Sequence, residues 1–229
     1  MSNSQQYIIP IDGGNATGKS FLGMEFAKRI GFTFMDSGLV YRVATLAVLE
    51  ERVNIHDGKI CAKLLDGIDM VFEIQEKDKT LTQHVRVGGL DITRLLHEPR
   101  IHEYVSTVAA HPEVREAAKR VYHRIIANKP TVMAGRDIGT VIFPDARLKF
   151  FITADFDLRA RRRMKQLGIT GEEQYEKIKR TIITRDEADS QRKTAPLQKA
   201  TDALEITNNG TPEEALAEMI KQYQSRIGS

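Results

Sequence analysis

The chain has 229 residues, of which 41% are hydrophobic and 28% charged, and its formal net charge is +3. This is the composition of a globular protein that buries about 70% of its unfolded surface in one or two domains. No apolar run reaches the roughly 20 residues of a membrane span, the first residues lack the pattern of a signal peptide, and the single cysteine, Cys61, cannot form an intrachain disulfide. We therefore expect a cytoplasmic protein.

A glycine-rich loop follows the first expected strand. Residues 13–20 read G-G-N-A-T-G-K-S and match the pattern G-x-x-x-x-G-K-S. The apolar run 7–11 precedes them, and a helical pattern over 21–30 follows. A strand, a glycine loop and a helix in this order are the context of a P-loop, whereas a plain glycine-rich turn would not need all eight positions. The motif predicts a site for a nucleoside triphosphate.

The residue types of this loop suit a polyphosphate and its metal ion. Gly13 and Gly18 leave room for backbone N–H groups to surround the phosphates at a helix N-terminus. The charge of Lys19 can reach the β and γ phosphates, and the Ser20 hydroxyl is an oxygen ligand of the kind Mg²⁺ prefers. The residues expected to bind ATP are Gly13, Gly14, Asn15, Ala16, Thr17, Gly18, Lys19 and Ser20, with Ser20 as the metal ligand.

Strands and helices alternate along most of the remaining chain, which predicts an α/β fold with a mostly parallel sheet. The expected strands cover 32–35, 70–74, 84–87, 131–134, 148–152 and 203–206, and the expected helices 40–51, 59–65, 100–110, 113–128, 157–167, 172–184 and a last one from 211. The two strands after residue 69 flank turns and indicate a small antiparallel insert. Ligands are expected where the parallel strands end.

Arginines occur where this arrangement places the ends of strands and helices. Arg42 and Arg136 follow strands, and Arg185 and Arg192 are expected just past the helix 172–184. Residues 155–193 hold 11 Lys and Arg against 8 Asp and Glu. Such a segment could face nucleic acid or fold over a polyphosphate, and the interspersed acids argue against a nucleic-acid surface. Guanidinium groups match phosphate bidentately, so we expect a second, phosphate-bearing substrate.

Four blocks of the sequence resemble the signature blocks of bacterial cytidylate (CMP) kinases, which are nucleoside monophosphate kinases of the P-loop class. They are D-S-G-L-V-Y-R at 36–42, V-R-E-A at 114–117, G-R-D-I-G-T-V-I-F-P-D-A at 135–146, and the residues Arg185-Asp186, Asp189-Ser190, Arg192 and Ala195-Pro196-Leu197. The blocks follow the order of the family over nearly the whole chain. The two C-terminal blocks are far more specific than the P-loop alone.

The resemblance implies a P-loop NTPase-type parallel sheet core with helices on both faces, an antiparallel insert and a helical lid. The core would comprise residues 1–66, 129–154 and 194–229, the monophosphate-binding insert 67–128 and the lid 155–193. We treat these three parts as one domain. Closure of the lid would exclude water and suppress hydrolysis of ATP.

The resemblance also assigns roles to residues. Ser106, Arg115 and Asp137 would read the cytosine edge, Asp189 with Arg185 would hold the ribose, and Arg42, Arg136 and Arg192 would hold the phosphate. The expected substrate-binding set is Ser37, Arg42, Ser106, Arg115, Arg136, Asp137, Arg185, Asp189 and Arg192, and the expected catalytic residues are Lys19, Arg136, Arg185 and Arg192. Arg159 and Arg163 are one helical turn apart, which suits a clamp on ATP.

The chain departs from the family in the P-loop and before the last helix, among other places. The usual loop reads G-P-S-G-A-G-K, whereas Gly14, Asn15, Ala16 and Thr17 form the interior here, and I-T-N-N at 206–209 differs from the usual run of an acidic and then a hydroxyl residue. These departures put the stiffness of the loop and the adenine contacts in doubt.

The predicted reaction is phosphoryl transfer from ATP, with Mg²⁺, to CMP and dCMP, giving CDP and dCDP. The alternatives are a kinase for UMP, AMP or a small alcohol, and a nucleic-acid-binding ATPase that uses the basic segment. We expect a monomer with small-molecule substrates and no nucleic-acid or membrane partner.

Overall fold

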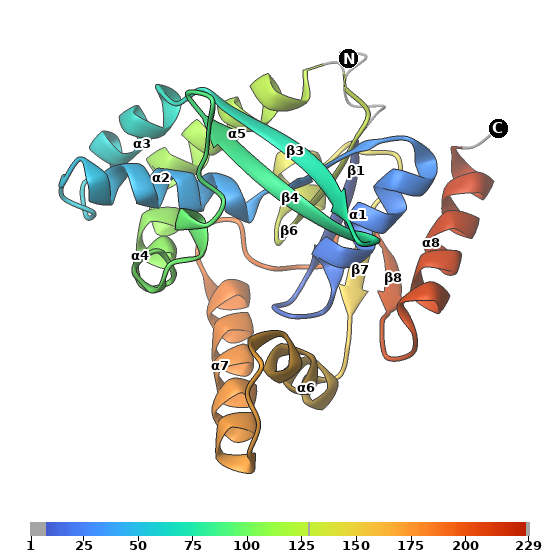
Figure 1. Ribbon diagram of the computed structural model, residues 1–229. Coiled ribbons are helices and arrows are strands. Elements are labelled where there is room, and N and C mark those ends of the chain that lie inside the picture. The colour runs from blue at the N-terminus through green and yellow to red at the C-terminus, as the bar shows by residue number, and fades with distance from the viewer. Residues whose placement is uncertain (1–7, 128, 228–229) are drawn as a thin grey trace. The chain divides into compact units, whose positions relative to one another are not determined.

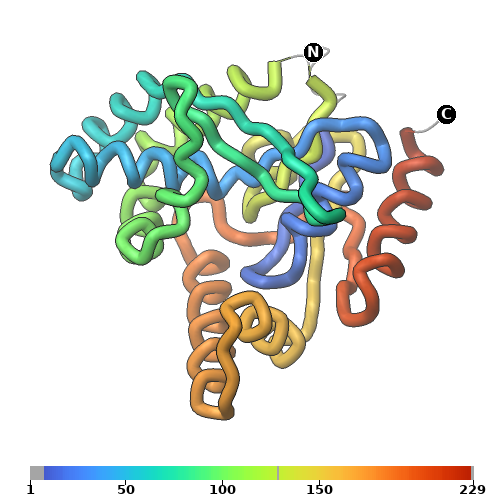
Figure 2. The backbone as a smooth tube through the Cα atoms, in the orientation of Figure 1, coloured from blue at the N-terminus to red at the C-terminus, as the bar shows by residue number. Residues whose placement is uncertain are grey.

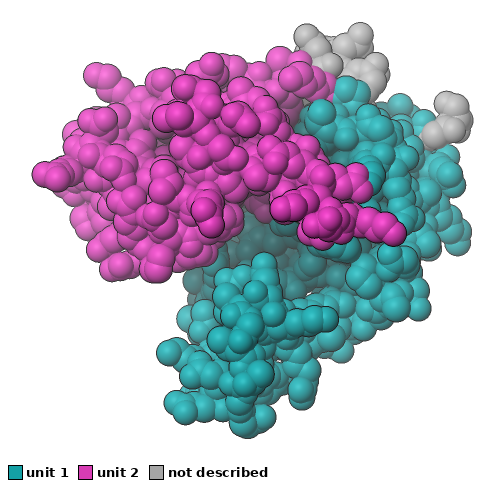
Figure 3. Space-filling model, in the orientation of Figure 1, with its two compact units in different colours: residues 1–34, 130–229 teal, residues 35–129 magenta. Residues whose placement is uncertain are grey.

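The computed structural model describes residues 8–127 and 129–227, and the chain divides into two compact units. One unit comprises residues 1–34 and 130–229, and the other residues 35–129 (Figure 3). The boundary differs from the predicted start of the insert at residue 67, because the helices predicted for 40–51 and 59–65 belong to the second unit. The division into core, insert and lid stays a prediction. In the part of the chain that the structure describes, no helix has the length and apolarity of a membrane span.

A five-stranded sheet organises the first unit (Figure 1). Its strands are β1 (Ile8–Gly13), β2 (Thr33–Asp36), β6 (Thr131–Gly135), β7 (Phe150–Thr153) and β8 (Leu204–Thr207). Their order is β2-β6-β1-β7-β8, and the pairs β1–β6, β1–β7 and β7–β8 are parallel. The central strand β1 is buried along its whole length, as its apolar sequence predicts.

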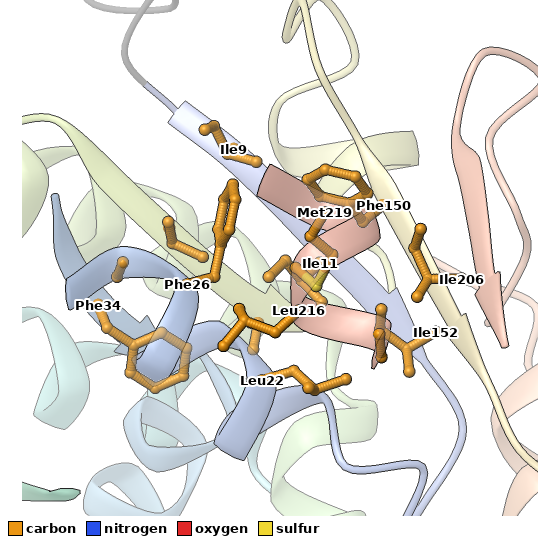
Figure 4. Packing of buried hydrophobic residues seen from close by; sticks show 14 of the residues in the cluster. Ile9, Ile11, Leu22, Phe26, Phe34, Phe150, Ile152, Ile206, Leu216 and Met219 are labelled. Carbon is orange, nitrogen blue, oxygen red and sulfur yellow. The ribbon is translucent and has the colours of Figure 1, made fainter. Parts of the chain in front are cut away.

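Helices α1 (Lys19–Ile30) and α8 (Pro212–Arg226) contact each other and pack their apolar sides on this sheet. The ring of Phe26 meets the Phe150 ring edge to face, with 5.5 Å between the centroids, and Leu216 and Met219 of α8 lie in the same cluster (Figure 4). Thr211 opens α8 with a capping box, in which its Oγ1 accepts from the Glu214 N–H and its own N–H donates to the Glu214 carboxylate. This core stabilises the sheet, and the loops after β1, β6 and β8 follow the ends of its strands.

Helices α6 (Phe156–Leu167) and α7 (Glu172–Gln191) form a hairpin with a small core of its own, and their paths can be followed in Figure 2. The prediction that α7 ends at residue 184 was wrong, because Arg185 and Asp189 lie inside the helix and Arg192 caps it. The sequence from 185 to 191 holds neither glycine nor proline, so nothing there stops the helix. The turn comes instead at Ala195, with a φ of +52°, just before a proline.

The second unit contains the predicted insert and most of the remaining helices. Its elements are α2 (Gly38–Glu50), α3 (Gly58–Asp66), β3 (Met70–Lys77), β4 (Thr80–Val87), β5 (Leu90–Asp91), a 3-10 turn (Leu95–His97), α4 (Pro99–Ala110) and α5 (Pro112–Ile126). The strands β3, β4 and β5 form an antiparallel sheet, and β3 and β4 are longer than predicted. Two predicted element ends lie outside the described residues. They are Asn128, the predicted end of the helix that begins at residue 113, and Tyr7, the predicted start of the first strand.

Candidate functional site

The register of the parallel strands brings several loops to one edge of the sheet. Asp12 of β1 is paired with Gly135 of β6, and Gly13 is paired with Ile152 of β7. Thr153 of β7 is in turn paired with Thr207 of β8. The loops after β1, β6 and β8 therefore start at nearly the same level, where ligands of open α/β sheets bind.

The P-loop curls around the amino group of Lys19. This side chain is only 8% exposed, and its Nζ donates to the Gly14 carbonyl oxygen at 3.0 Å. Thr17 Oγ1 donates to the same oxygen at 3.1 Å. Gly18 has a φ of +91°, a conformation that favours glycine, directly before α1 begins. The loop thus ends at the N-terminus of α1, where the motif predicts an anion site.

The hairpin α6–α7 supplies partners for the interior of this loop. Asp186 Oδ1 accepts from the Asn15 N–H at 2.7 Å, and Arg159 Nε donates to the Asn15 carbonyl oxygen at 2.7 Å. Arg159 and Asp186 are also paired with each other, and both side chains are largely buried. A side chain at Gly14 would clash with the Asp186 carboxylate, and Ala16 packs against the core of the hairpin. A carboxylate of the chain itself thus occupies a P-loop amide.

The segment after β8 holds the other side of the loop. Asn208 Nδ2 donates to the Thr17 carbonyl oxygen at 2.9 Å, and a Cβ on Gly18 would lie 2.5 Å from that nitrogen. Arg162 of α6 donates to the carbonyl oxygens of Asn208 and Gly210 at 2.8 and 3.3 Å. Burial lowers the pKa of the Arg162 guanidinium. The atypical residues at 14–17 and 208 therefore contact one another or the lid.

A network of charges continues from the loop after β6 to the end of α7. Arg136 Nε donates to Asp189 Oδ2 at 2.9 Å. Arg192 lies 3.4 Å from Asp189 and 3.6 Å from the buried carboxylate of Asp137. Loss of solvent around the guanidinium, and then the charge of Arg136, lower the pKa of Arg185. The structure thus brings together five of the predicted substrate-binding residues, and its three arginines exceed its two carboxylates by one charge.

The second unit carries the other predicted substrate residues. The Tyr122 hydroxyl donates to the Ser37 carbonyl oxygen at 3.1 Å, which holds the start of α2 on α5. The guanidinium of the buried Arg115 lies 5.5 Å from the centre of the Tyr41 ring.

Arg42 Nη1 donates to the Leu96 carbonyl oxygen at 2.9 Å and lies 3.4 Å from His102 Nδ1. Ser106 is an exposed residue of α4. Within this unit, contacts between α2 and α5 bring Ser37 and Arg115 together. Arg42 lies on the side of α2 that meets the 3-10 turn and α4.

Arg159 and Arg163, the predicted clamp on ATP, have different partners in the structure, and four further polar residues contact the strand-end loops. Arg159 contacts the P-loop and Arg163 Nη1 donates to Gln166, whereas Arg162 reaches the segment after β8. The residues that were not predicted from the sequence contact the loops after β1, β6 and β8, and they are Asp12, Arg162, Asp186 and Asn208. Two of them had a signal, since Asp12 directly precedes the glycine loop and Asp186 follows Arg185.

The P-loop fits a Mg²⁺ ion that is held mainly by the phosphates of its nucleotide. Among residues 8–127 and 129–227 no group of three or more His, Cys, Asp or Glu residues is placed to hold a metal ion. Mg²⁺ in phosphoryl-transfer sites is commonly bound by one or two protein oxygens, with phosphates and water as the other ligands. Ser20, the second residue of α1, can supply such an oxygen.

Comparisons with known proteins agree with these motifs. The family model described as cytidylate kinase matches residues 9–225. Cytidylate kinases of Shouchella clausii and Streptococcus pneumoniae are 36% and 39% identical to the chain, covering 95% and 93% of it and 97% and 95% of their own lengths.

A crystal structure of a Thermus thermophilus protein shares the fold, with a TM-score of 0.50 at 19% identity, covering 97% of this chain and 98% of its own. The chain belongs to the cytidylate kinase family.

Proposed function

We propose that the protein transfers the γ-phosphoryl group of ATP to CMP and to dCMP. The observation that carries this proposal is the pairing, at one sheet edge, of a complete P-loop with the loop of Arg136 and Asp137. The first holds a triphosphate, and the second offers charged groups for a phosphate and a base. Membership of the cytidylate kinase family supports a cytidine acceptor.

The chemistry requires positioning more than proton transfer. The attacking atom is a phosphate oxygen that is already anionic near neutral pH, so no general base is needed. Lys19 would stabilise the charge of the transferring group, and Arg136, Arg185 and Arg192 would align the acceptor phosphate. Mg²⁺ held by Ser20 and the nucleotide would neutralise phosphate charge. Closing of residues 155–193 would keep water from the transferring group.

We assign the acceptor base to Asp137, Arg115 and Ser106, because cytosine needs both donors and acceptors at its edge. Asp189 with Arg185 would hold the ribose, and Ser37 and Arg42 would complete the phosphate contacts. Arg159 would clamp ATP, with Arg163 as its predicted second member. The monomeric state and the cytoplasmic location remain predictions.

A coupled assay of ADP release with CMP, dCMP, UMP and AMP tests the proposal. We expect turnover with the two cytidine nucleotides well above that with UMP or AMP. A preference for AMP, or hydrolysis of ATP that depends on added DNA or RNA, would contradict it.

A further inference from the structure

The carboxylate of Asp12 joins the two loops of the proposed site, and neither the motif nor the proposed reaction uses it. It is the last residue of β1 before Gly13 and only 4% exposed. Its oxygens accept from the Ile138 N–H at 2.9 Å and the Gly139 N–H at 2.7 Å. Both donors follow directly after Asp137, so the carboxylate is tied to the loop after β6.

The backbone that carries these two N–H groups has an unusual helical form, and the Asp12 carboxylate is the acceptor for both groups. Residues 138–142 form a single π-helical turn, a form that is rare and is often found at functional sites. The first N–H groups of any helix lack partners within the helix, and here Asp12 accepts from two of them. Without it, two buried donors would lose their acceptors, at a cost of about 1–3 kcal/mol each.

Gly139 shows how closely the carboxylate is fitted. A Cβ on this residue would lie 3.3 Å from Asp12 Oδ2 and from Pro10 Cβ, and 3.2 Å from Lys149 Cδ. A side chain of any other residue would therefore push on the carboxylate. The contact depends on glycine at 139 and on the register of β1 with β6.

We propose that Asp12 is a positioning residue whose carboxylate sets where Arg136 and Asp137 lie beside the P-loop. The proposal rests on the proposed function, because it concerns the spacing between the donor and the acceptor of the transferred group. Asp12 does not touch either substrate in this scheme, and it acts through the loop after β6.

The pKa of the Asp12 carboxyl is a second observable, and it is lost when a neutral residue replaces Asp12. Burial raises its pKa from 3.8 to about 6, although the bonds from Gly139 and Ile138 lower it, and Asp137 raises it further while Lys19 lowers it. A native pKa above the unfolded value means that the carboxyl group stabilises the fold most below pH 3.8. This contribution is lost as the pH rises through about 6.

Asp12→Asn is the first test. The amide oxygen can accept from only one of the two N–H groups, and the amide nitrogen faces the other. We expect kcat with CMP to fall about tenfold and the KM for CMP to rise, since the lost bonds are charge-assisted. The Kd for inorganic pyrophosphate, a probe of the P-loop alone, should stay within about twofold.

Gly139→Ala keeps the charge and displaces the carboxylate, so it carries the test if the first variant does not fold. It should lower kcat in the same direction by a smaller factor. The exposed Glu213→Gln on α8 is the matched control and should leave all three constants unchanged. If Asp12→Asn and Gly139→Ala both keep the wild-type kcat and the wild-type KM for CMP, and only their melting temperatures fall, the proposal is overturned.

Carbon-detected NMR of the ligand-free protein gives a readout that does not depend on activity. The Asp12 carboxyl should titrate near pH 6, and the amide signals of Ile138 and Gly139 should follow it. A titration of Asp12 that the amide signals of Ile138 and Gly139 do not follow would overturn the proposal. If the wild-type protein fails to phosphorylate CMP while this titration is observed, the proposed function fails and the link between the two loops stands.

Discussion

The loops after β1 and after β6 lie side by side, yet they are held in different ways. The P-loop is bonded by the hairpin α6–α7, because Asp186 and Arg159 bond the N–H and the carbonyl of Asn15. The loop after β6 also contacts this hairpin, at Arg136, but its N–H groups at 138 and 139 are held by the buried carboxylate of Asp12. The first set of bonds includes an amide that the motif assigns to phosphate, whereas the carboxylate in the second set is only 4% exposed.

This difference suggests a division of roles between the two loops. We expect a loop whose amide is occupied by a carboxylate of its own chain to exchange that anion for a phosphate when a nucleotide binds. We expect a loop held by a buried group to keep its geometry whether or not a substrate is present. The donor side is then adjustable and the acceptor side fixed.

Lys19→Met tests the donor side with the largest expected effect. Loss of the charge that stabilises the transferring group should lower kcat by about 10²–10³-fold, a magnitude typical of removing one preorganised donor. Steady-state formation of CDP measures it. Lys165→Met, an exposed position on α6, serves as the control. A loss below tenfold would argue that Lys19 only holds the Gly14 carbonyl.

Asp137→Ala tests whether the fixed loop serves the acceptor. Its carboxylate is buried beside Arg192, so its loss should raise the KM for CMP by about 10- to 100-fold. The KM for ATP should change by less than about twofold. Equal losses for both substrates would show that Asp137 supports the fold or the metal instead.

Asp186→Asn tests whether the carboxylate competes with phosphate for the P-loop. Removing the competing charge should tighten the binding of inorganic pyrophosphate by about tenfold, as measured by titration calorimetry. Gly14→Ala should act in the same direction, because its Cβ would displace the carboxylate. The adjacent exposed Glu187→Gln is the control. Weaker binding in both variants would mean that Asp186 prepares the site rather than occupying it.

Ala16→Gly has the smallest expected effect. Ala16 has a φ of +58°, which strains a residue other than glycine by about 1–2 kcal/mol. Its methyl group packs against the core of the hairpin α6–α7, and burial of one such group contributes about 0.8 kcal/mol. The two terms oppose each other, so the free energy of unfolding in urea should change by about 1 kcal/mol or less. A larger change would mean that this contact couples loop and lid more strongly.

The sequence predicted what depends on local patterns. The P-loop follows from eight adjacent residues, and the strand that precedes Arg136 follows from a short apolar run. The partners of these loops could not be predicted in this way, because Asn15 and Asp186 are 171 residues apart and Asp12 and Ile138 are 126 apart. The end of α7 was predicted too early, at residue 184, although the sequence up to Gln191 holds neither glycine nor proline and the helix continues to that residue.

The parallel register of β1 with β6 has a consequence for how such an enzyme can change over time. The register fixes where the two loops begin relative to each other, and the Asp12 carboxylate then holds the second loop beside the first. A slip of one residue would turn every side chain of the strand to the opposite face. Insertions within these strands should therefore be far rarer among relatives than substitutions in the loops that the strands carry. The register of the sheet can change only in steps of one residue, so the level at which each loop begins can change only in those steps.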